Sequence, residues 1–261
     1  MGGAPSVPTD SRRELQVIGA GYSRTGTVSM GMALEQLLQG PVMHGGTQIL
    51  GREDAYAKLW TRIFAERKNK PVLMKLLKEA TEGFVGLTDS PGSLFLEELL
   101  ELYPNCKVVL VKRDIHAWYK SMQPIMENTQ LNPLLFRALL LPIPTWRWFP
   151  KIIQGMGSRE IERLNGVPFT PDMLLTYNDW VRAHVRPEKL MEMEMAEGWE
   201  PLAKFLNTTV PSTPFPRAND AAAMTAYINR ILITASLAWL GIFTVLGLAC
   251  WLSWTSFGWN K

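Results

Sequence analysis

A short apolar run, a Gly-, Ser- and Thr-rich loop and a helical pattern follow one another near the start of the chain. Residues 15–18 predict a buried strand, the loop carries one cation, Arg24, and residues 29–38 place apolar side chains at helical spacing. Strand, tight loop and helix together direct backbone N–H groups and the positive end of a helix dipole at one place. This segment therefore predicts a binding site for phosphate or sulfate.

Two common phosphate-binding patterns fit this loop only in part. The dinucleotide pattern G-x-G-x-x-G is matched by Gly19 and Gly21, but its third glycine falls on Arg24. The nucleotide pattern G-x-x-x-x-G-K-[ST] is matched by Gly21 and Gly26, but Thr27 stands where the lysine belongs. On this loop alone a dinucleotide oxidoreductase, an NTPase and a plain glycine-rich turn with a surface arginine all stay open.

Apolar runs of strand length alternate with helical patterns in the middle of the chain. Predicted strands cover residues 83–89, 107–111 and 190–195, and predicted helices cover 52–68, 75–82, 93–102, a segment after Asp114, and 200–206. Strands separated by helices predict right-handed βαβ units and a mostly parallel sheet. Ligands of such sheets lie at the carboxyl ends of the strands, so Arg24, Asp89 and Arg113 are expected to converge there.

A long apolar run lies near the C-terminus. Residues 231–252 contain no charged side chain, and Arg230 and Lys261 flank them. At about 1.5 Å per residue, this run is long enough for a hydrocarbon core of about 30 Å. Aromatic side chains that suit the membrane interface lie near its ends: Tyr227, Trp251, Trp254 and Trp259. The run predicts a transmembrane helix, and the alternative is a buried core helix.

The expected fold is therefore an α/β, three-layer, P-loop-type parallel sheet flanked by helices, with one C-terminal transmembrane helix. The expected segments are a disordered tail 1–13, a domain 14–210, a linker 211–229, a membrane helix 230–254 and a short tail 255–261. No apolar signal segment opens the chain. We therefore expect a single-pass, tail-anchored membrane protein with residues 1–225 in the cytosol.

Composition argues against several classes of partner. The formal net charge is only +3 and no long basic run occurs, so no nucleic-acid partner is expected. Cys106 and Cys250 lie far apart, which argues against a disulfide framework. The three histidines show no metal-ligand spacing, so no metal site is expected.

Two motifs resemble the nucleotide-binding signatures of sulfotransferases. Residues 22–27, Tyr-Ser-Arg-Thr-Gly-Thr, resemble the 5′-phosphosulfate loop, usually Tyr-Pro-Lys-Ser-Gly-Thr-Thr, with Arg24 at the lysine position and Val28 replacing a threonine. An arginine that ends a strand and a serine eight residues later, here Arg113 and Ser121, resemble the 3′-phosphate signature. Such a pair can reach one phosphate, and the planar guanidinium can bond two of its oxygens.

The resemblance extends to the segment that carries the catalytic base. Residues 87–91, Leu-Thr-Asp-Ser-Pro, are similar to the Lys-Thr-His-Leu-Pro segment of cytosolic sulfotransferases, with Asp89 at the base position and Leu87 at that of a lysine. The alternative is that Asp89 only caps the following helix. Residues 197–202 and 214–220 look like the close of the P-loop sulfotransferase-like family common in fungi, so the resemblance spans about residues 14–220.

The resemblance implies transfer of a sulfuryl group from 3′-phosphoadenosine 5′-phosphosulfate (PAPS) to a hydroxyl or amine, without a metal. Asp89 and Arg24 are the implied catalytic residues. The implied donor-binding residues are Ser23, Arg24, Thr25, Gly26, Thr27, Val28, Arg113 and Ser121. Two alternatives stay open: a membrane-bound scaffold that binds nucleotide without transfer, and a P-loop kinase or NTPase.

The acceptor is the least defined part of this reading. Residues 132–155 form a Pro-rich apolar segment that fits three roles: lining an acceptor pocket, dipping into a bilayer, or packing on the core as a lid helix. Residues 176–180 and His184 are candidates to border the same pocket. A membrane setting and this apolar segment favour a lipophilic acceptor.

Overall fold

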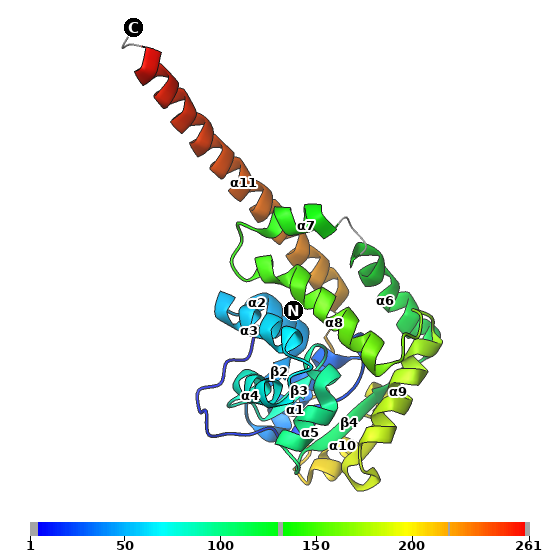
Figure 1. Ribbon diagram of the computed structural model, residues 1–261. Coiled ribbons are helices and arrows are strands. Elements are labelled where there is room, and N and C mark those ends of the chain that lie inside the picture. The colour runs from blue at the N-terminus through cyan, green and yellow to red at the C-terminus, as the bar shows by residue number, and fades with distance from the viewer. Residues whose placement is uncertain (1–4, 130–132, 219, 259–261) are drawn as a thin grey trace.

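The computed structural model describes residues 5–129, 133–218 and 220–258 (Figure 1). The segments expected as tails fall partly outside these ranges, as do Trp259 and Lys261. Within the described part, residues 5–13 have no regular secondary structure but contact the domain. Gln48 Nε2 donates to the Ser6 carbonyl at 2.7 Å, and Arg13 Nη1 donates to the Gln39 carbonyl at 2.8 Å.

Five parallel strands form one sheet in the order β2-β3-β1-β4-β5. The strands are β1 (Val17–Gly19), β2 (Val42–His44), β3 (Gly86–Thr88), β4 (Lys107–Lys112) and β5 (Leu190–Glu194). Ile18 pairs with Leu87 of β3 on one side and with Val108 of β4 on the other. The parallel sheet expected from the alternation is therefore confirmed, with the chain's opening strand at its centre.

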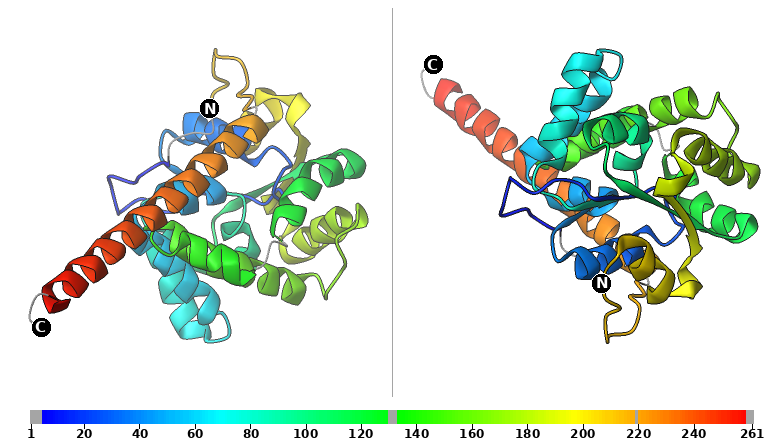
Figure 2. Two further views of the ribbon diagram at one scale, coloured as in Figure 1. Left: turned by 90° about the horizontal axis from the view of Figure 1, so that it is seen from above. Right: turned by 90° about the horizontal axis from the view of Figure 1, so that it is seen from below.

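The sheet separates two apolar clusters, which makes the domain three-layered. Along β4, Val109 and Val111 face the cluster that contains α1 (Thr27–Leu38) and α10 (Trp199–Leu206). Val108 and Leu110 belong to the larger cluster on the opposite face. Alternation of side chains along a strand explains why a continuous apolar run is needed for a sheet buried on both faces. Figure 2 shows α1 and α10 together on one side of the sheet.

The larger cluster is formed by helices from the rest of the chain. These are α2 (Gly45–Gly51), α3 (Asp54–Ala65), α4 (Lys70–Thr81), η1 (Gly92–Phe95), α5 (Leu96–Leu102), α6 (Ile115–Thr129), η2 (Trp146–Trp148), α8 (Phe149–Arg163) and α9 (Asp172–His184). Two short 3-10 helices flank β5, η3 (Pro187–Lys189) and η4 (Met195–Glu197). Most predicted elements are present with ends shifted by a few residues. Strand β2 and helix α2 were not predicted.

The C-terminal helix α11 (Asp220–Gly258) leaves the domain as a long rod (Figure 1). Its residues 228–255 are long and apolar enough to cross a membrane by length and composition, and most of them are exposed. Near its start, Ile231 and Ala235 pack on α7 (Pro133–Leu140) and η2. Trp239 Nε1 donates to the Ala138 carbonyl at 3.0 Å. The apolar run is therefore not a buried core helix. The helix that carries it begins at Asp220, inside the segment 211–229 that was expected as a linker.

Gly45 is required where β2 turns into α2. A Cβ on Gly45 would lie 1.9 Å from the Ser90 carbonyl oxygen, so the backbone after β3 leaves no room for a side chain. We expect Gly45→Ala to lower the free energy of unfolding by about 3 kcal/mol, because neither backbone segment can move freely. Urea unfolding of the full chain in detergent micelles, followed by tryptophan fluorescence, measures this change.

The matched control is Gly157→Ala in α8. In the described part of the chain, no atom other than those of its chain neighbours and the adjoining helix backbone lies within 4 Å of a Cβ placed on Gly157. Because alanine is the better helix former, the free energy of unfolding of this variant should rise by about 0.5–1 kcal/mol. Equal stability of the two variants would contradict the close approach at Gly45.

Candidate functional site

Each of the five strands is followed, at its carboxyl end, by a loop or residue of the candidate site. The loop 20–26 follows β1, His44 ends β2, Asp89 follows β3, Arg113 follows β4 and Met195 follows β5. Because the sheet is parallel, all these ends lie on one edge, as the sequence predicted for Arg24, Asp89 and Arg113.

The loop after β1 is held by bonds within itself and from α6. Thr25 Oγ1 donates to the Tyr22 carbonyl at 2.7 Å, and Trp118 Nε1 donates to the Ser23 carbonyl at 3.0 Å. Gly26 adopts φ 103°, a left-handed conformation that favours glycine, and a Cβ there would lie 2.8 Å from Met195 Cγ. The loop therefore has a fixed shape where it enters α1.

The N-terminus of α1 is open toward the site. Gly26 at the N-cap has no side chain to accept a bond, and the first turn holds no acidic residue. Thr27 is buried, whereas Val28 is half-buried. Uncapped first-turn N–H groups and the helix dipole favour an anion at this position.

Arg24, Ser121 and Arg113 meet beside this helix start. Arg24 Nε lies 3.2 Å from Ser121 Oγ, and Arg113 Nη1 donates to the Arg24 carbonyl oxygen. Burial, followed by the nearby charge of Arg24, lowers the pKa of the Arg113 guanidinium. Two neighbouring cations and a hydroxyl therefore form a group of side chains suited to a phosphate.

Asp89 reaches across the loop and β2 rather than toward the following helix. Ser23 Oγ donates to Asp89 Oδ1 at 2.7 Å, and the Gly46 N–H donates to Oδ2 at 3.2 Å. Only the backbone oxygen of Asp89 accepts a bond from η1, from the Ser93 N–H at 3.1 Å. Among the described residues its carboxylate accepts no bond from the helix that follows it, so capping of that helix is not supported; the Gly46 N–H that it does accept belongs to the first turn of α2.

His44 is a residue of this site that the sequence analysis missed. Its Nε2 lies 3.1 Å from Thr27 Oγ1 and 3.5 Å from Asp89 Oδ2. The signal that could have found it is a short apolar pair, Val42-Met43, ending in a polar residue before two glycines. The strand before Asp89 was likewise recognised from an apolar run that ends in polar residues.

A buried aromatic and acidic cluster supports the loop from behind. The Tyr22 hydroxyl donates to Glu160 Oε1 of α8, and the Tyr22 ring packs edge-on against Tyr177 at 4.8 Å between centroids. Burial raises the pKa of Glu160, and the bond from Tyr22 opposes that rise. Burial and the Glu160 charge raise the pKa of Tyr22 well above its usual range. No pattern in the sequence pointed to Glu160.

Two other residues singled out in the sequence, Leu87 and His184, have structural positions instead. Leu87 is fully buried in the core of β3. His184 bonds the Trp180 carbonyl through Nδ1 at 2.7 Å and lies 3.4 Å from Glu97, which places it in a structural cluster of α9 and α5. Tyr177, within 176–180, does contact the loop through Tyr22.

The apolar segment 132–155 folds mainly as a layer packed on the domain. Within its described part, Ile152 and Phe149 of α8 join the larger core cluster, and Trp148 Nε1 donates to Asp54 Oδ1 at 2.9 Å. Leu134 and Leu135 of α7 are 74% and 70% exposed, so this end of the segment presents an apolar surface.

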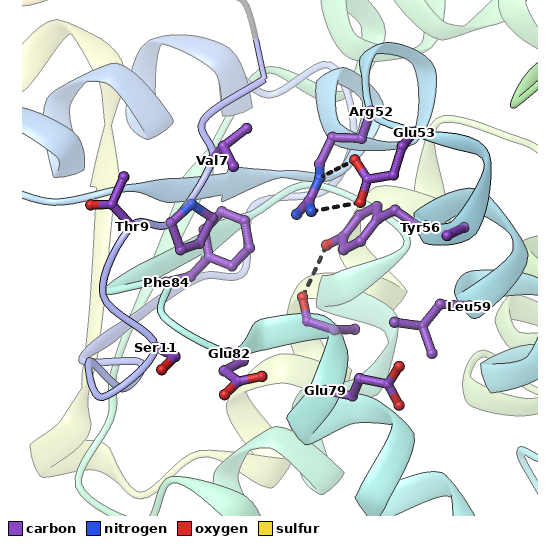
Figure 3. Close-up of a pocket in the computed structure, with 13 residues that line it drawn as sticks. Val7, Thr9, Ser11, Arg52, Glu53, Tyr56, Leu59, Glu79, Glu82 and Phe84 are labelled. Atoms are coloured by element: carbon purple, nitrogen blue, oxygen red, sulfur yellow. Dashed lines mark hydrogen bonds and ion pairs between the residues drawn. The ribbon is translucent and has the colours of Figure 1, made fainter.

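A cavity of about 390 Å³ lies away from this site (Figure 3). Val7 and Thr9 of the N-terminal segment, Phe84 before β3, and the Arg52–Glu53 ion pair line it. No residue predicted for the site lines it. Among the described residues, no group of His, Cys, Asp or Glu is arranged to hold a metal ion.

Comparison with known proteins identifies the class of this fold and site. The sequence profile of the "Sulfotransferase domain" family matches residues 16–224, most of the chain. The chain therefore belongs to the sulfotransferase domain family, which confirms the resemblance seen in its motifs.

Individual relatives are more distant. "Ava biosynthesis cluster protein M" from Aspergillus versicolor is 27% identical over 214 residues, 77% of this chain and 80% of that protein. The crystal structure of a sulfotransferase from Alicyclobacillus acidocaldarius matches with a TM-score of 0.38 and 16% identity, over 84% of this chain and 93% of that chain.

The raised pKa of Glu160 predicts a pH dependence of stability. Because burial makes the carboxyl hold its proton more tightly in the folded chain, the folded state loses stability as pH rises above about 4.3, the unfolded value. Glu160→Gln removes this loss. The stability of the wild type relative to this variant should therefore fall as the pH rises above about 4.3 in urea titrations.

Glu162→Gln on the same helix provides the control. Although burial opposes it, the bonds and charges of Arg67 and Arg159 lower the pKa of Glu162. Its contribution is present above about pH 4.3 and is lost only on acidification. A stability difference between the wild type and Glu160→Gln that does not change as the pH rises would contradict the prediction.

Proposed function

We propose that this chain transfers a sulfuryl group from PAPS to a hydroxyl or amine of an unidentified, lipophilic acceptor. The observation that carries the proposal is the contact between Arg24, Ser121 and Arg113 beside the uncapped start of α1, next to Asp89. The candidate site therefore combines two positions that suit an anion, the start of α1 and the Arg113–Ser121 pair, with the Asp89 carboxylate.

The residues of the loop and of β4 fit the two ends of the donor. The loop 23–28 offers N–H groups and the Thr25 and Thr27 hydroxyls to the 5′-phosphosulfate. Arg113 and Ser121 suit the 3′-phosphate, which ATP and NAD lack. Burial is the main cause of the lowered pKa of Arg113 and the charge of Arg24 the second, and an anion between the two cations would relieve their repulsion.

Arg24 and Asp89 take the two chemical roles. When bound, PAPS supplies the sulfuryl group. Asp89 accepts the proton that the acceptor hydroxyl loses as its oxygen bonds to sulfur, while the bond from sulfur to the bridging phosphate oxygen breaks and its electron pair leaves with the nucleotide. Arg24 stabilises the charge on that oxygen by preorganised electrostatics and cannot itself donate a proton.

The proposed acceptor class rests on the setting of the domain. We assign α11 as a single membrane anchor with the domain on the cytosolic side. Its apolar stretch of 28 residues is about 42 Å long, about 12 Å more than a bilayer core needs. The excess corresponds to the first turns, where Ile231 and Ala235 pack on α7. The exposed Leu134 and Leu135 then lie beside the membrane surface, from which an apolar acceptor can enter.

Two alternatives differ in what they bind and turn over. A scaffold would bind the nucleotide without transfer. An NTPase is disfavoured because Thr27 stands at the position of the phosphate-binding lysine. Magnesium-dependent ATP hydrolysis would mark that second alternative.

The donor site is tested by calorimetric binding of adenosine 3′,5′-bisphosphate to the full chain in detergent micelles. We expect micromolar binding, with ATP and NAD much weaker. Arg24→Ala and Arg113→Ala should each weaken binding at least about tenfold, because each removes a charge-assisted hydrogen bond to phosphate. Arg186→Ala serves as control, since Arg186 is exposed and pairs with Glu188 at 3.3 Å.

A second arm separates transfer from binding. Asp89→Asn should keep the nucleotide affinity and lose transfer to octanol, a simple apolar hydroxyl probe. A folded wild-type chain that binds no nucleotide would overturn the donor proposal. Binding without consumption of PAPS, with octanol or water as acceptor, would favour the scaffold.

The anchor is tested by alkaline carbonate extraction of cell membranes. The wild-type chain should stay in the membrane pellet, whereas Val245→Arg combined with Ala249→Arg should release it. Each arginine near the middle of a span costs about 2.5–3.5 kcal/mol on insertion scales. Val210→Arg, a charge added at an exposed site outside α11, should leave the chain in the pellet. Release of the wild type would contradict the assignment.

A further inference from the structure

His44 connects the start of α1 to Asp89 and belongs to neither family motif. Its side chain is only 13% exposed, and that of Asp89 is 12% exposed. Nε2 faces Thr27 Oγ1 at 3.1 Å and Asp89 Oδ2 at 3.5 Å. The imidazole therefore lies between the proposed phosphosulfate loop and the proposed base.

The other ring nitrogen determines which tautomer the neutral ring adopts. Nδ1 accepts the Thr47 N–H at 3.3 Å and lies 2.9 Å from Thr47 Oγ1, so His44 is also the N-cap of α2. An N–H donor directed at Nδ1 requires a lone pair there. The neutral ring therefore carries its proton on Nε2, pointing at Thr27 and Asp89.

The backbone around His44 has little freedom to move this ring. Gly45 lies against the Ser90 carbonyl, where no side chain fits, and the Gly46 N–H bonds Asp89 Oδ2. The end of β2 is thus seated on the segment that carries Asp89. An imidazole held in this way limits where the neighbouring carboxylate can lie.

We propose that His44 is a positioning residue for the transfer, an inference that rests on the proposed function. Nε2 is hydrogen-bonded to Thr27 Oγ1 and lies against Asp89 Oδ2 at 3.5 Å, so the imidazole keeps the base and the donor loop in one relative position. His44 is not itself the base, because Thr47 occupies its second nitrogen. The proton of the acceptor passes to Asp89.

Two conservative variants separate positioning from helix capping. His44→Asn keeps a preferred N-cap side chain but is too short to reach Asp89. His44→Gln keeps an N–H donor near the position of Nε2 but gives up the cap. If His44 positions Asp89, the Asn variant should lose at least about tenfold in kcat while the Gln variant stays within about threefold of wild type. PAPS consumption with octanol or water as acceptor provides the rate.

Nucleotide affinity shows whether a negative result concerns the positioning role of His44 or the proposed function itself. Adenosine 3′,5′-bisphosphate should bind all three proteins within about threefold, because Arg24, Arg113 and Ser121 are untouched. An Asn variant that matches the wild type, or a Gln variant that alone loses activity, would overturn the positioning role and leave only a cap. No binding by the wild type would overturn the proposed function itself.

The tautomer can be tested without turnover. The chain has three histidines, so nitrogen NMR of histidine-labelled full chain in micelles is tractable, with His44→Gln assigning the resonance. We expect a neutral ring protonated at Nε2, with an Nε2 signal that shifts in Asp89→Asn and in Thr27→Val. Protonation at Nδ1, or an Nε2 signal that neither substitution moves, would overturn the proposal.

Discussion

The parallel pairing of five short strands is the constraint on which the site depends. Each strand ends at the same edge, where contacts between the ends follow the strand order from β2 to β4, and the residue after β5 contacts the loop after β1. His44 of β2 lies against Asp89 after β3, Asp89 bonds Ser23 after β1, Arg113 after β4 bonds the Arg24 carbonyl, and Met195 after β5 covers Gly26. A shift of one strand by one residue would turn its polar end residue away from its neighbours.

The same edge concentrates groups that stabilise an anion rather than the ligand-free fold. Arg24 and Arg113 lie close together, and the approach contributes to the lowered pKa of Arg113. The start of α1 is left without a side-chain cap, because Gly26 occupies the N-cap position with a left-handed backbone. The stability of the domain must therefore come from the two apolar clusters on either face of the sheet, and the edge is left arranged for binding.

The sequence was sufficient to predict the loop and the Arg113–Ser121 pair of the candidate site, but not the residues that pack around them. The loop around Arg24 and the Arg113–Ser121 pair follow long, distinct patterns, so both were found, as was the strand before Asp89. Strand β2 has only three residues, too few for any periodicity, and His44 joins Asp89 only because β2 pairs with β3. Glu160 meets Tyr22 across 138 residues, a distance that no local pattern spans.

The proposed anchor and the proposed base are connected through one short helix. Leu50, near the end of α2, packs against both the main core cluster and the small cluster that joins α7 and η2 to α11. The opposite end of α2 begins at His44 and supplies the Gly46 N–H that Asp89 accepts. Because α2 is short and held at both ends, it fixes the site relative to the first turns of α11. With α11 in a bilayer, the edge of the sheet would keep one orientation toward the membrane, an arrangement that suits an acceptor dissolved in lipid more than one drawn from water.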